Sequence, residues 1–253
     1  MITTIWGLLI FSNVTKGSVP AALVVGLLAP LSCGAVTVAG RVALVLSHDP
    51  NVRKHQDYSG VVVWLEPASG VPAVPTSAHH AEMIQKDKTF LPHVLAVTAG
   101  TVVDFPNYDP IFHNAFSNFD GQVFDIGLYP PGTSRSIPFR REGIVRVFCN
   151  IHPTMSAVIV VLRSPYFAVS NKSGVFQISD VAPGSYRLHV FHERATEQTL
   201  DELVRTVEAS SDQVQLPPIS VSESGYLQVP HKNKFGKEYP VAPGSGAYPG
   251  QRP

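Results

Sequence analysis

The residues best suited to chemistry lie in one heptapeptide, CNIHPTM, which runs from Cys149 to Met155. It spaces a thiol, an imidazole and a thioether three residues apart on one short segment. A thiolate and two imidazoles in a trigonal plane, with a weak axial thioether, form the ligand set that holds copper for one-electron transfer. The heptapeptide supplies one histidine. The second must come from elsewhere, and PNYDPIFHNAFS (106–117) offers His113 followed by Asn114.

The composition indicates a folded, all-β chain. With 253 residues, of which 44% are hydrophobic and 15% charged, the chain can bury a large core as one large domain or two small ones. The formal net charge is zero, so no broad electrostatic field points to nucleic acid or to an anionic membrane surface. The 19 glycines and 22 prolines separate short apolar runs, which favours strands joined by turns.

The first 35 residues are expected to form an export signal. The apolar run Val19 to Leu31 is too short for a comfortable transmembrane helix, and the small residues after it fit cleavage after about Ala35 or Ala39. The mature protein is therefore expected in the periplasm or outside the cell. Cys33 in APLSCG offers an alternative, lipid attachment, and only then would the protein be held at a membrane.

Removal of this signal would leave Cys149 as the only cysteine. Exported proteins normally pair their cysteines, so a single one indicates a reactive thiol, an intermolecular disulfide or a metal ligand. His152 and Met155 on the same segment favour the metal ligand. Structural zinc is disfavoured because it takes four strong ligands, usually several thiolates.

The heptapeptide resembles the ligand loop of amicyanin-like cupredoxins, which are small blue copper proteins. KDKTFLPHVLAVTAGTVVDFPNYD (86–109) is similar to the opening strands of that family, and the His113–Asn114 pair matches its first ligand histidine. The resemblance covers about residues 82–162 and implies a Greek-key sandwich or barrel. It implies one mononuclear copper site whose ligands are His113, Cys149, His152 and axial Met155.

The flanking sequence suits such a site. The apolar run GIVRVFC (143–149) ends on Cys149, and AVIVVL (157–162) resumes just after the loop, so three ligands would lie between two strands. Pro153 restricts its own backbone and that of the preceding histidine. Asn114 is a candidate outer residue that could tie the His113 segment to the Cys149 loop by hydrogen bonding.

A second resemblance follows the copper module. This resemblance is to the carboxypeptidase regulatory-like, or transthyretin-like, β-sandwich, and it is carried by SNKSGVFQISDVAPGSYRLHV (170–190). The opening strands of such a sandwich would be supplied by GRVALVL (40–46) and VVVWLEP (61–67). We therefore expect the copper module to be inserted between the second and third strands of this smaller sandwich. The simpler alternative is two domains in series with an independent N-terminal hairpin. Residues 197–211 are expected to form a turn of helix running into a strand.

The expected division of the chain has six parts. They are a signal peptide (1–35), the first strands of the regulatory-like sandwich (36–67), a linker (68–81), the cupredoxin domain (82–162), the remainder of the sandwich (165–222) and a flexible tail (223–253).

The remaining polar residues carry weaker signals. His93 is expected on a strand surface, and His79 with His80 in a linker could bind metal only weakly. His189 and His192 lie three apart on an expected strand, so they face opposite sides and cannot readily share a metal. The chain has no nucleophile elbow, phosphate-binding glycine loop or HExxH motif, and Asp104, Asp109, Asp120 and Asp125 form no convincing catalytic pair.

The sequence thus predicts an exported blue copper protein for one-electron transfer, with no enzymatic activity of its own. Its expected partner is a transient redox protein, either a c-type cytochrome or a quinoprotein dehydrogenase such as amicyanin's partner. One alternative is an extracytoplasmic module that binds carbohydrate or protein, with incidental copper. Another is copper storage or delivery.

Overall fold

The computed structural model describes residues 34–70, 79–118, 121–227 and 231–239, all within one compact unit that spans 33–253. The expected signal peptide lies outside the described residues except for its last two positions. In the described part, strands dominate and the two helices are short, which confirms the all-β prediction. Neither of these helices is long and apolar enough to cross a membrane.

The elements in chain order are β1 (Val36–Val45), α1 (Pro50–His55), β2 (Val62–Pro67), β3 (His80–Glu82), β4 (Ile84–Lys86), β5 (Thr89–Leu91), β6 (Val94–Thr98), β7 (Thr101–Pro106), β8 (Phe116–Ser117), β9 (Phe124–Asp125), β10 (Ser134–Phe139), β11 (Gly143–Phe148), β12 (Ser156–Leu162), β13 (Phe167–Val169), β14 (Val175–Val181), β15 (Gly184–Phe191), α2 (Glu197–Glu202), β16 (Arg205–Ala209), β17 (Gln213–Gln215) and β18 (Ile219–Ser222).

The sandwich that contains the heptapeptide has two main sheets. One has the strand order β10-β7-β3 and the other β6-β12-β11-β8-β9, while β4 and β5 form a hairpin. Inward-facing residues of both sheets, such as Phe105 on β7, Phe139 on β10 and Ile159 on β12, form one buried core. Cys149 and Met155 belong to the same core, so the loop between β11 and β12 is anchored in it.

Strand β12 is buried on both faces. Ala157, Ile159 and Val161 face the core that also holds Cys149. The alternate residues Val158 and Val160 belong to a separate buried cluster. This explains why the strand is an unbroken apolar run instead of an alternating one, and it gives the end of the ligand loop a fixed frame.

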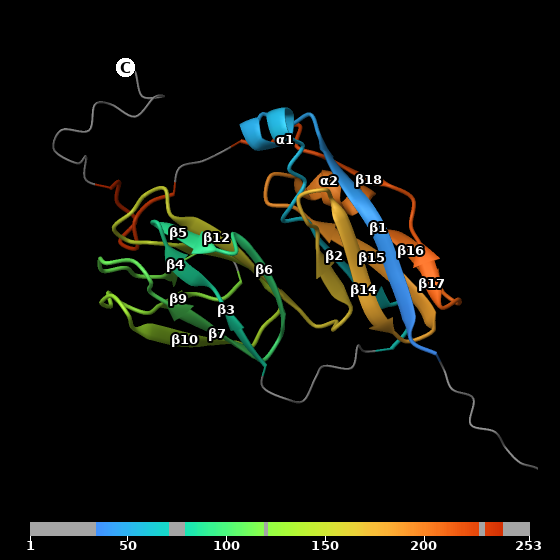
Figure 1. Cartoon of the computed structure of the whole chain (residues 1–253), viewed down its shortest axis with the longest axis horizontal. Coiled ribbons are helices and arrows are strands. Elements are labelled where there is room, and N and C mark those ends of the chain that lie inside the picture. Colours follow the sequence, from blue (N-terminus) through green and yellow to red (C-terminus); the bar gives the residue numbers. More distant parts are fainter. Residues whose placement is uncertain (1–33, 71–78, 119–120, 228–230, 240–253) are drawn as a thin grey trace, which may run out of the picture. The chain divides into compact units, whose positions relative to one another are not determined.

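A second sandwich combines early and late parts of the chain. One sheet has the order β14-β1-β17, with β18 also on β1, and the other has the order β13-β2-β15-β16. In Figure 1, the blue strand β1 lies among strands from the far end of the sequence, and the register places Gly40 opposite Phe176 of β14. Strand β2 pairs with β13 and β15 in the same way, so β1 and β2 each lie in a sheet with later strands.

The polar turn before β14, at residues 171–174, requires its glycine. Gly174 has a φ of +77°, and a Cβ added there would lie 2.1 Å from the carbonyl oxygen of Val42 on β1. The Gly174 N–H closes the turn onto the Asn171 carbonyl at 2.8 Å. The turn thus holds β14 against β1, because any side chain at this position would separate them.

Local sequence signals anticipated one of the two helices and missed the other. Helix α2 followed by β16 matches the expected turn of helix running into a strand. Helix α1 lies in the polar stretch between β1 and β2, for which the sequence analysis predicts no helix. Asp49 caps its N-terminus by accepting from the Asn51 N–H, and Pro50 occupies the first turn, where a missing N–H costs nothing.

The C-terminal part differs from the expected flexible tail wherever the structure describes it. Residues 231–239 lie against the ligand loop, where the Tyr239 hydroxyl donates to the Cys149 carbonyl at 2.8 Å. This segment is red in Figure 1. Residues 228–230 and 240–253 lie outside the described part.

Candidate metal centre

The heptapeptide forms a tight connection between two paired strands. Phe148 at the end of β11 lies opposite Ser156 at the start of β12. Within the loop, the Cys149 N–H donates to the Met155 carbonyl and the Met155 N–H donates to the His152 carbonyl, each at 3.1 Å. Two backbone hydrogen bonds therefore set the spacing of all three candidate ligands on this loop.

His113 comes from the segment between β7 and β8 and is fixed through its own backbone. Its N–H donates to the Tyr129 carbonyl at 3.2 Å, and the Tyr129 N–H donates to the His113 carbonyl at 2.9 Å. Tyr129 is fully buried, and its hydroxyl donates to the Phe105 carbonyl at 2.8 Å. The position of His113 is thus tied to the core of the sandwich.

The structure brings the predicted thiol and imidazoles together. The Cys149 Sγ lies 3.9 Å from the His113 Nδ1 and 3.6 Å from the His152 Nδ1. The two imidazole rings have centroids 4.8 Å apart, at 59° to each other. In the described ranges, these three residues are the one group of three or more cysteine, histidine or acidic side chains close enough to share a metal ion.

The candidate ligands differ in exposure. His113, Cys149 and Met155 are 0% exposed, whereas His152 is half-buried. Burial, followed by the neighbouring His113, lowers the pKa of His152 below its ordinary value, so this imidazole is neutral at neutral pH. A neutral imidazole offers a lone pair to a metal without first losing a proton.

Asp109 orients the buried histidine. Its Oδ2 lies 2.7 Å from the His113 Nε2, and its carboxylate also accepts from the backbone N–H groups of Asp87 at 2.6 Å and Lys88 at 2.9 Å. Burial raises the pKa of the Asp109 carboxyl, but these hydrogen bonds outweigh it and hold the pKa below the ordinary value. An ionised carboxylate favours the proton on Nε2, which leaves the Nδ1 lone pair facing the Cys149 sulfur.

Sequence reasoning considered Asp109 only as a catalytic carboxylate and missed this contact. The available signal was its position four residues before His113 in the same short segment.

The candidate outer residues lie beside the ligands. The Asn150 N–H donates to the Asn114 Oδ1 at 3.0 Å, which links the His113 segment to the Cys149 loop in the way the sequence suggested. Pro153 follows His152 within the loop and is half-buried.

The donor set fits copper. One thiolate sulfur, two imidazole nitrogens and a thioether are soft or borderline donors, and this combination is typical of electron-transfer copper sites. The two nitrogen donors already point at the sulfur from different elements of a β scaffold, so little rearrangement is needed to bind a metal.

Four histidines that the sequence singled out, His80, His93, His189 and His192, have partners outside this group. His80 contacts Asp104, and His93 contacts Glu193. His189 stacks on the Trp64 ring with centroids 5.2 Å apart, whereas His192 is 3% exposed and bonds Glu223.

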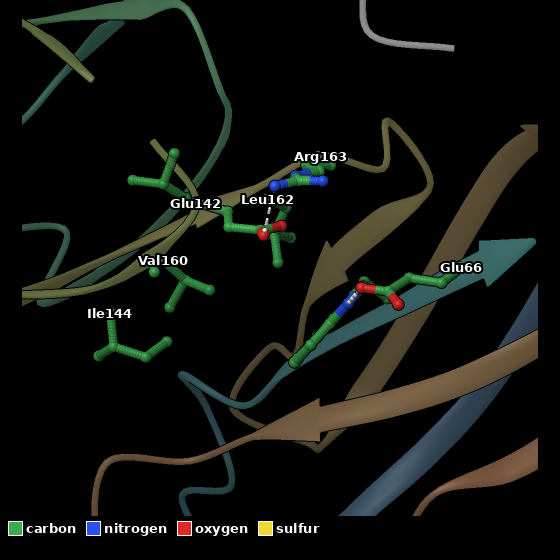
Figure 2. Close-up of a pocket in the computed structure, with 9 residues that line it drawn as sticks. Glu66, Glu142, Ile144, Val160, Leu162 and Arg163 are labelled. Atoms are coloured by element: carbon green, nitrogen blue, oxygen red, sulfur yellow. Dashed lines mark hydrogen bonds and ion pairs between the residues drawn. The ribbon is translucent and has the colours of Figure 1, made fainter. Parts of the chain in front are cut away.

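A cavity of about 150 Å³ lies near β2, β11 and β12 and is separate from the candidate ligands. Figure 2 shows its two polar pairs: the Glu142–Arg163 ion pair at 2.8 Å, and Glu66, which accepts from the Trp64 ring N–H at 3.0 Å. These carboxylates already have partners, and the cavity contains none of the predicted site residues.

Comparison with known proteins relates part of the chain to one curated relative and to several solved structures. The chain is 32% identical over 82 residues to the methylamine utilization protein MauL from Methylorubrum extorquens, a match that covers 32% of this chain and 72% of that protein. A purple cupredoxin from Nitrosopumilus maritimus is 25% identical, with a TM-score of 0.29 and coverage of 32% of this chain and 98% of that chain. Amicyanin from Paracoccus versutus is 20% identical, with a TM-score of 0.31 and coverage of 39% and 96%. No protein-family model matches the chain. By its 32% identity to MauL across 72% of that protein, the chain belongs to the MauL family.

Proposed function

We propose that His113, Cys149, His152 and Met155 bind one copper ion and that the protein is an exported, mononuclear blue copper protein that carries single electrons. The observation that supports this best is the convergence of two Nδ1 atoms on one buried thiol sulfur. Bound copper would cycle between Cu(II) and Cu(I), taking one electron from a reduced donor protein and giving it to an oxidised acceptor.

The protein's own contribution is a site that changes little between the two states. The backbone hydrogen bonds inside the Cys149 loop and those between His113 and Tyr129 hold the ligands before the metal binds. Full burial of Cys149 and Met155 keeps water away from the sulfur donors. A preformed site without water lowers the reorganisation energy of electron transfer, because few atoms must move when the oxidation state changes.

Electrons would enter and leave at the half-buried edge of His152. Exposed apolar side chains lie next in sequence to site residues: Ile151 (42% exposed) precedes His152, and Phe112 (54% exposed) precedes His113. A small apolar surface of this kind suits a weak and short-lived encounter between redox proteins. Ile151→Lys should therefore lower the electron self-exchange rate between oxidised and reduced copies, measured by nuclear magnetic resonance, without changing the visible spectrum.

The proposed partner is a c-type cytochrome or a quinoprotein dehydrogenase outside the cytoplasm. The relative MauL is named for methylamine utilization, which favours a dehydrogenase as the electron donor. Attachment to a membrane would require lipidation of Cys33.

Addition of Cu(II) to the purified protein tests the proposal. We expect an intense visible band from charge transfer between thiolate and copper, together with a reversible midpoint potential. Cys149→Ser should abolish the band, whereas Cys33→Ser, the matched control at the other cysteine, should retain it. A colourless wild-type protein would refute electron transfer and favour a binding module. Colour without reversible reduction would favour copper storage or delivery.

The second sandwich supports a further proposal on domain organisation. Residues 36–67 and 165–222 would form one regulatory-like sandwich, with the copper-binding domain (82–162) inserted into it. The support is the pairing of β1 with β14 and of β2 with β15. Under rising denaturant, the β1 and β14 amides should lose protection from hydrogen exchange together. Independent loss of protection in β1 and β2 would favour two domains in series.

A further inference from the structure

The segment 231–239 is a structured turn placed over the ligand loop. Within it, the Asn233 side-chain oxygen accepts from the N–H groups of Phe235 at 2.9 Å and Lys237 at 3.0 Å. The Gly236 N–H also donates to the Asn233 carbonyl at 2.9 Å. The turn is therefore held by its own hydrogen bonds and can present a defined face to the loop.

Two aromatic residues of this segment cover the start of the loop. The His231 ring stacks on the Phe148 ring, with centroids 4.1 Å apart and planes at 25°. The Tyr239 hydroxyl donates to the Cys149 carbonyl at 2.8 Å and lies 3.2 Å from the His231 Nδ1. These contacts lie on the residue that supplies the candidate thiolate and on the residue before it.

Lys234 completes a closed ring of hydrogen bonds around the site. Its backbone N–H donates to the Asn150 Oδ1 at 3.0 Å, and its Nζ donates to the Asp125 Oδ2 at 2.7 Å. The ring continues from Asp125 Oδ1, which accepts from the Asn114 side-chain nitrogen at 2.7 Å, and returns from Asn114 Oδ1 to the Asn150 N–H at 3.0 Å. Hydrogen bonds thus join four residues, each from a separate segment of the chain, into one closed ring.

The ring connects the two segments that carry the candidate ligands. Asn114 follows His113, and Asn150 follows Cys149, so the distance between these asparagines constrains the distance between the ligands. The ion pair alone is partly exposed and would contribute little as an isolated contact. Its effect comes from closing the ring, because a closed network restrains geometry that a single contact leaves free.

We propose that residues 231–239 act as a clasp that positions the copper ligand loop and shields Cys149 from solvent. Lys234 and Tyr239 are its positioning residues, and neither is offered as a ligand. The expected effect of the clasp on copper-loaded protein rests on the proposed copper function. Its shielding of the thiol can be measured without any metal.

The test compares the double variant Lys234→Met/Tyr239→Phe with Lys237→Met, an exposed lysine of the same turn, in full-length protein carrying Cys33→Ser. In the metal-free protein, the rate at which a thiol reagent modifies Cys149 should rise about tenfold in the double variant. In the copper-loaded protein, removal of Cu(I) by a chelator should also accelerate about tenfold, and the midpoint potential should move. Lys237→Met should match the parent in every assay.

Rates in the double variant equal to those of Lys237→Met would overturn the clasp. Lys234→Arg, with Tyr239 unchanged, keeps a cation for Asp125. Its thiol modification and copper removal rates should stay close to those of the parent, and rates as high as those of the double variant would contradict the role of the ring. A parent protein that develops no visible copper band would refute the proposed function, while the thiol modification rates would still decide for or against the clasp.

Discussion

The two sandwiches each bury a histidine against a carboxylate, and the comparison shows what makes one pair a candidate metal site. His113 is 0% exposed and its Nε2 lies 2.7 Å from Asp109, while His192 is 3% exposed and its Nε2 lies 2.8 Å from Glu223. The two pairs differ at the other ring nitrogen. The His113 Nδ1 faces the Cys149 sulfur, whereas the His192 Nδ1 has no hydrogen-bond partner within the described ranges.

The carboxylates differ as well. Glu223 accepts from the Arg194 guanidinium at 3.1 Å and from the Ser47 hydroxyl at 2.6 Å, so its charge is balanced within the second sandwich. In addition to its contact with His113, the Asp109 carboxylate accepts hydrogen bonds from two backbone N–H groups. Among the described residues, no lysine or arginine side chain forms an ion pair with it. Its negative charge is therefore left to support a cation bound by His113. A buried histidine and carboxylate indicate a metal site only where a further donor and an unbalanced charge accompany them.

The largest effect, a loss of stability, is expected from breaking the His192–Glu223 pair in the second sandwich. Glu223→Ala removes the carboxylate that His192 and Arg194 share, so the buried His192 loses its partner while Arg194 keeps Asp49 and Glu193. We expect the free energy of unfolding to fall by about 3 kcal/mol, the lower end for a broken buried ion pair, because Arg194 is partly exposed. Denaturant unfolding of the metal-free protein measures this loss.

The matched control for that change is Glu208→Ala, an exposed glutamate on β16 whose carboxylate accepts from the Ser185 hydroxyl. It should change the free energy of unfolding by less than about 0.5 kcal/mol. Neither variant should alter the copper band. A loss of the band in Glu223→Ala, with folding preserved, would contradict the separation between the two histidine pairs.

The next effect is on metal affinity. Asp109→Asn removes the charge that holds the His113 tautomer, so copper affinity should fall about 10- to 100-fold. Competition with a chelator of known affinity measures this change. Asp87→Asn is the control, because Asp87 is exposed and donates to Asp109 only through its backbone N–H. Equal affinities in the two variants would show that the carboxylate does not support the metal.

Sequence reasoning was most successful where the signal is local. The strands on either side of CNIHPTM could be read because 143–148 and 156–162 are apolar runs interrupted by a polar loop. Helix α2 could be anticipated from the helical spacing of the apolar residues at 200, 203, 204 and 207, which continues past its end. The pairing of His113 with the loop required the family resemblance, because no spacing rule brings together two segments that are 36 residues apart.

Contacts that depend on the tertiary fold could not be read in this way. Residues 231–239 are polar and rich in turn formers, which predicts a tail, and Tyr239 reaches Cys149 across 90 residues of sequence. Glu223 was assigned to the same tail, although it is 4% exposed and bonds His192. In both cases the partner is known only once the sheets are assembled.

The smallest effect concerns pH and separates two histidines of opposite behaviour. Burial lowers the pKa of His192, although the hydrogen bond with Glu223 opposes this. The hydrogen bond with Glu193 raises the pKa of His93, against a smaller effect of burial. An unfolded chain has both near 6.5. As the pH falls below that value, unfolded His192 takes up a proton that the folded protein refuses, so His192 destabilises the fold in acid.

His93 acts in the other direction, because its stabilising contribution is complete below about pH 6.5 and is lost as the pH rises through its higher folded pKa. Denaturant unfolding of metal-free protein at about pH 7.5 and about pH 5.5 resolves the two. The acid-induced loss of stability should become smaller in His192→Gln and larger in His93→Gln, relative to the parent. The ligand histidines contribute equally to all three proteins and cancel in the difference. If both variants changed the acid-induced loss of stability in the same direction, the opposite pKa shifts of His93 and His192 would be contradicted. The contrast between the His192–Glu223 pair and the His113–Asp109 pair would then be lost.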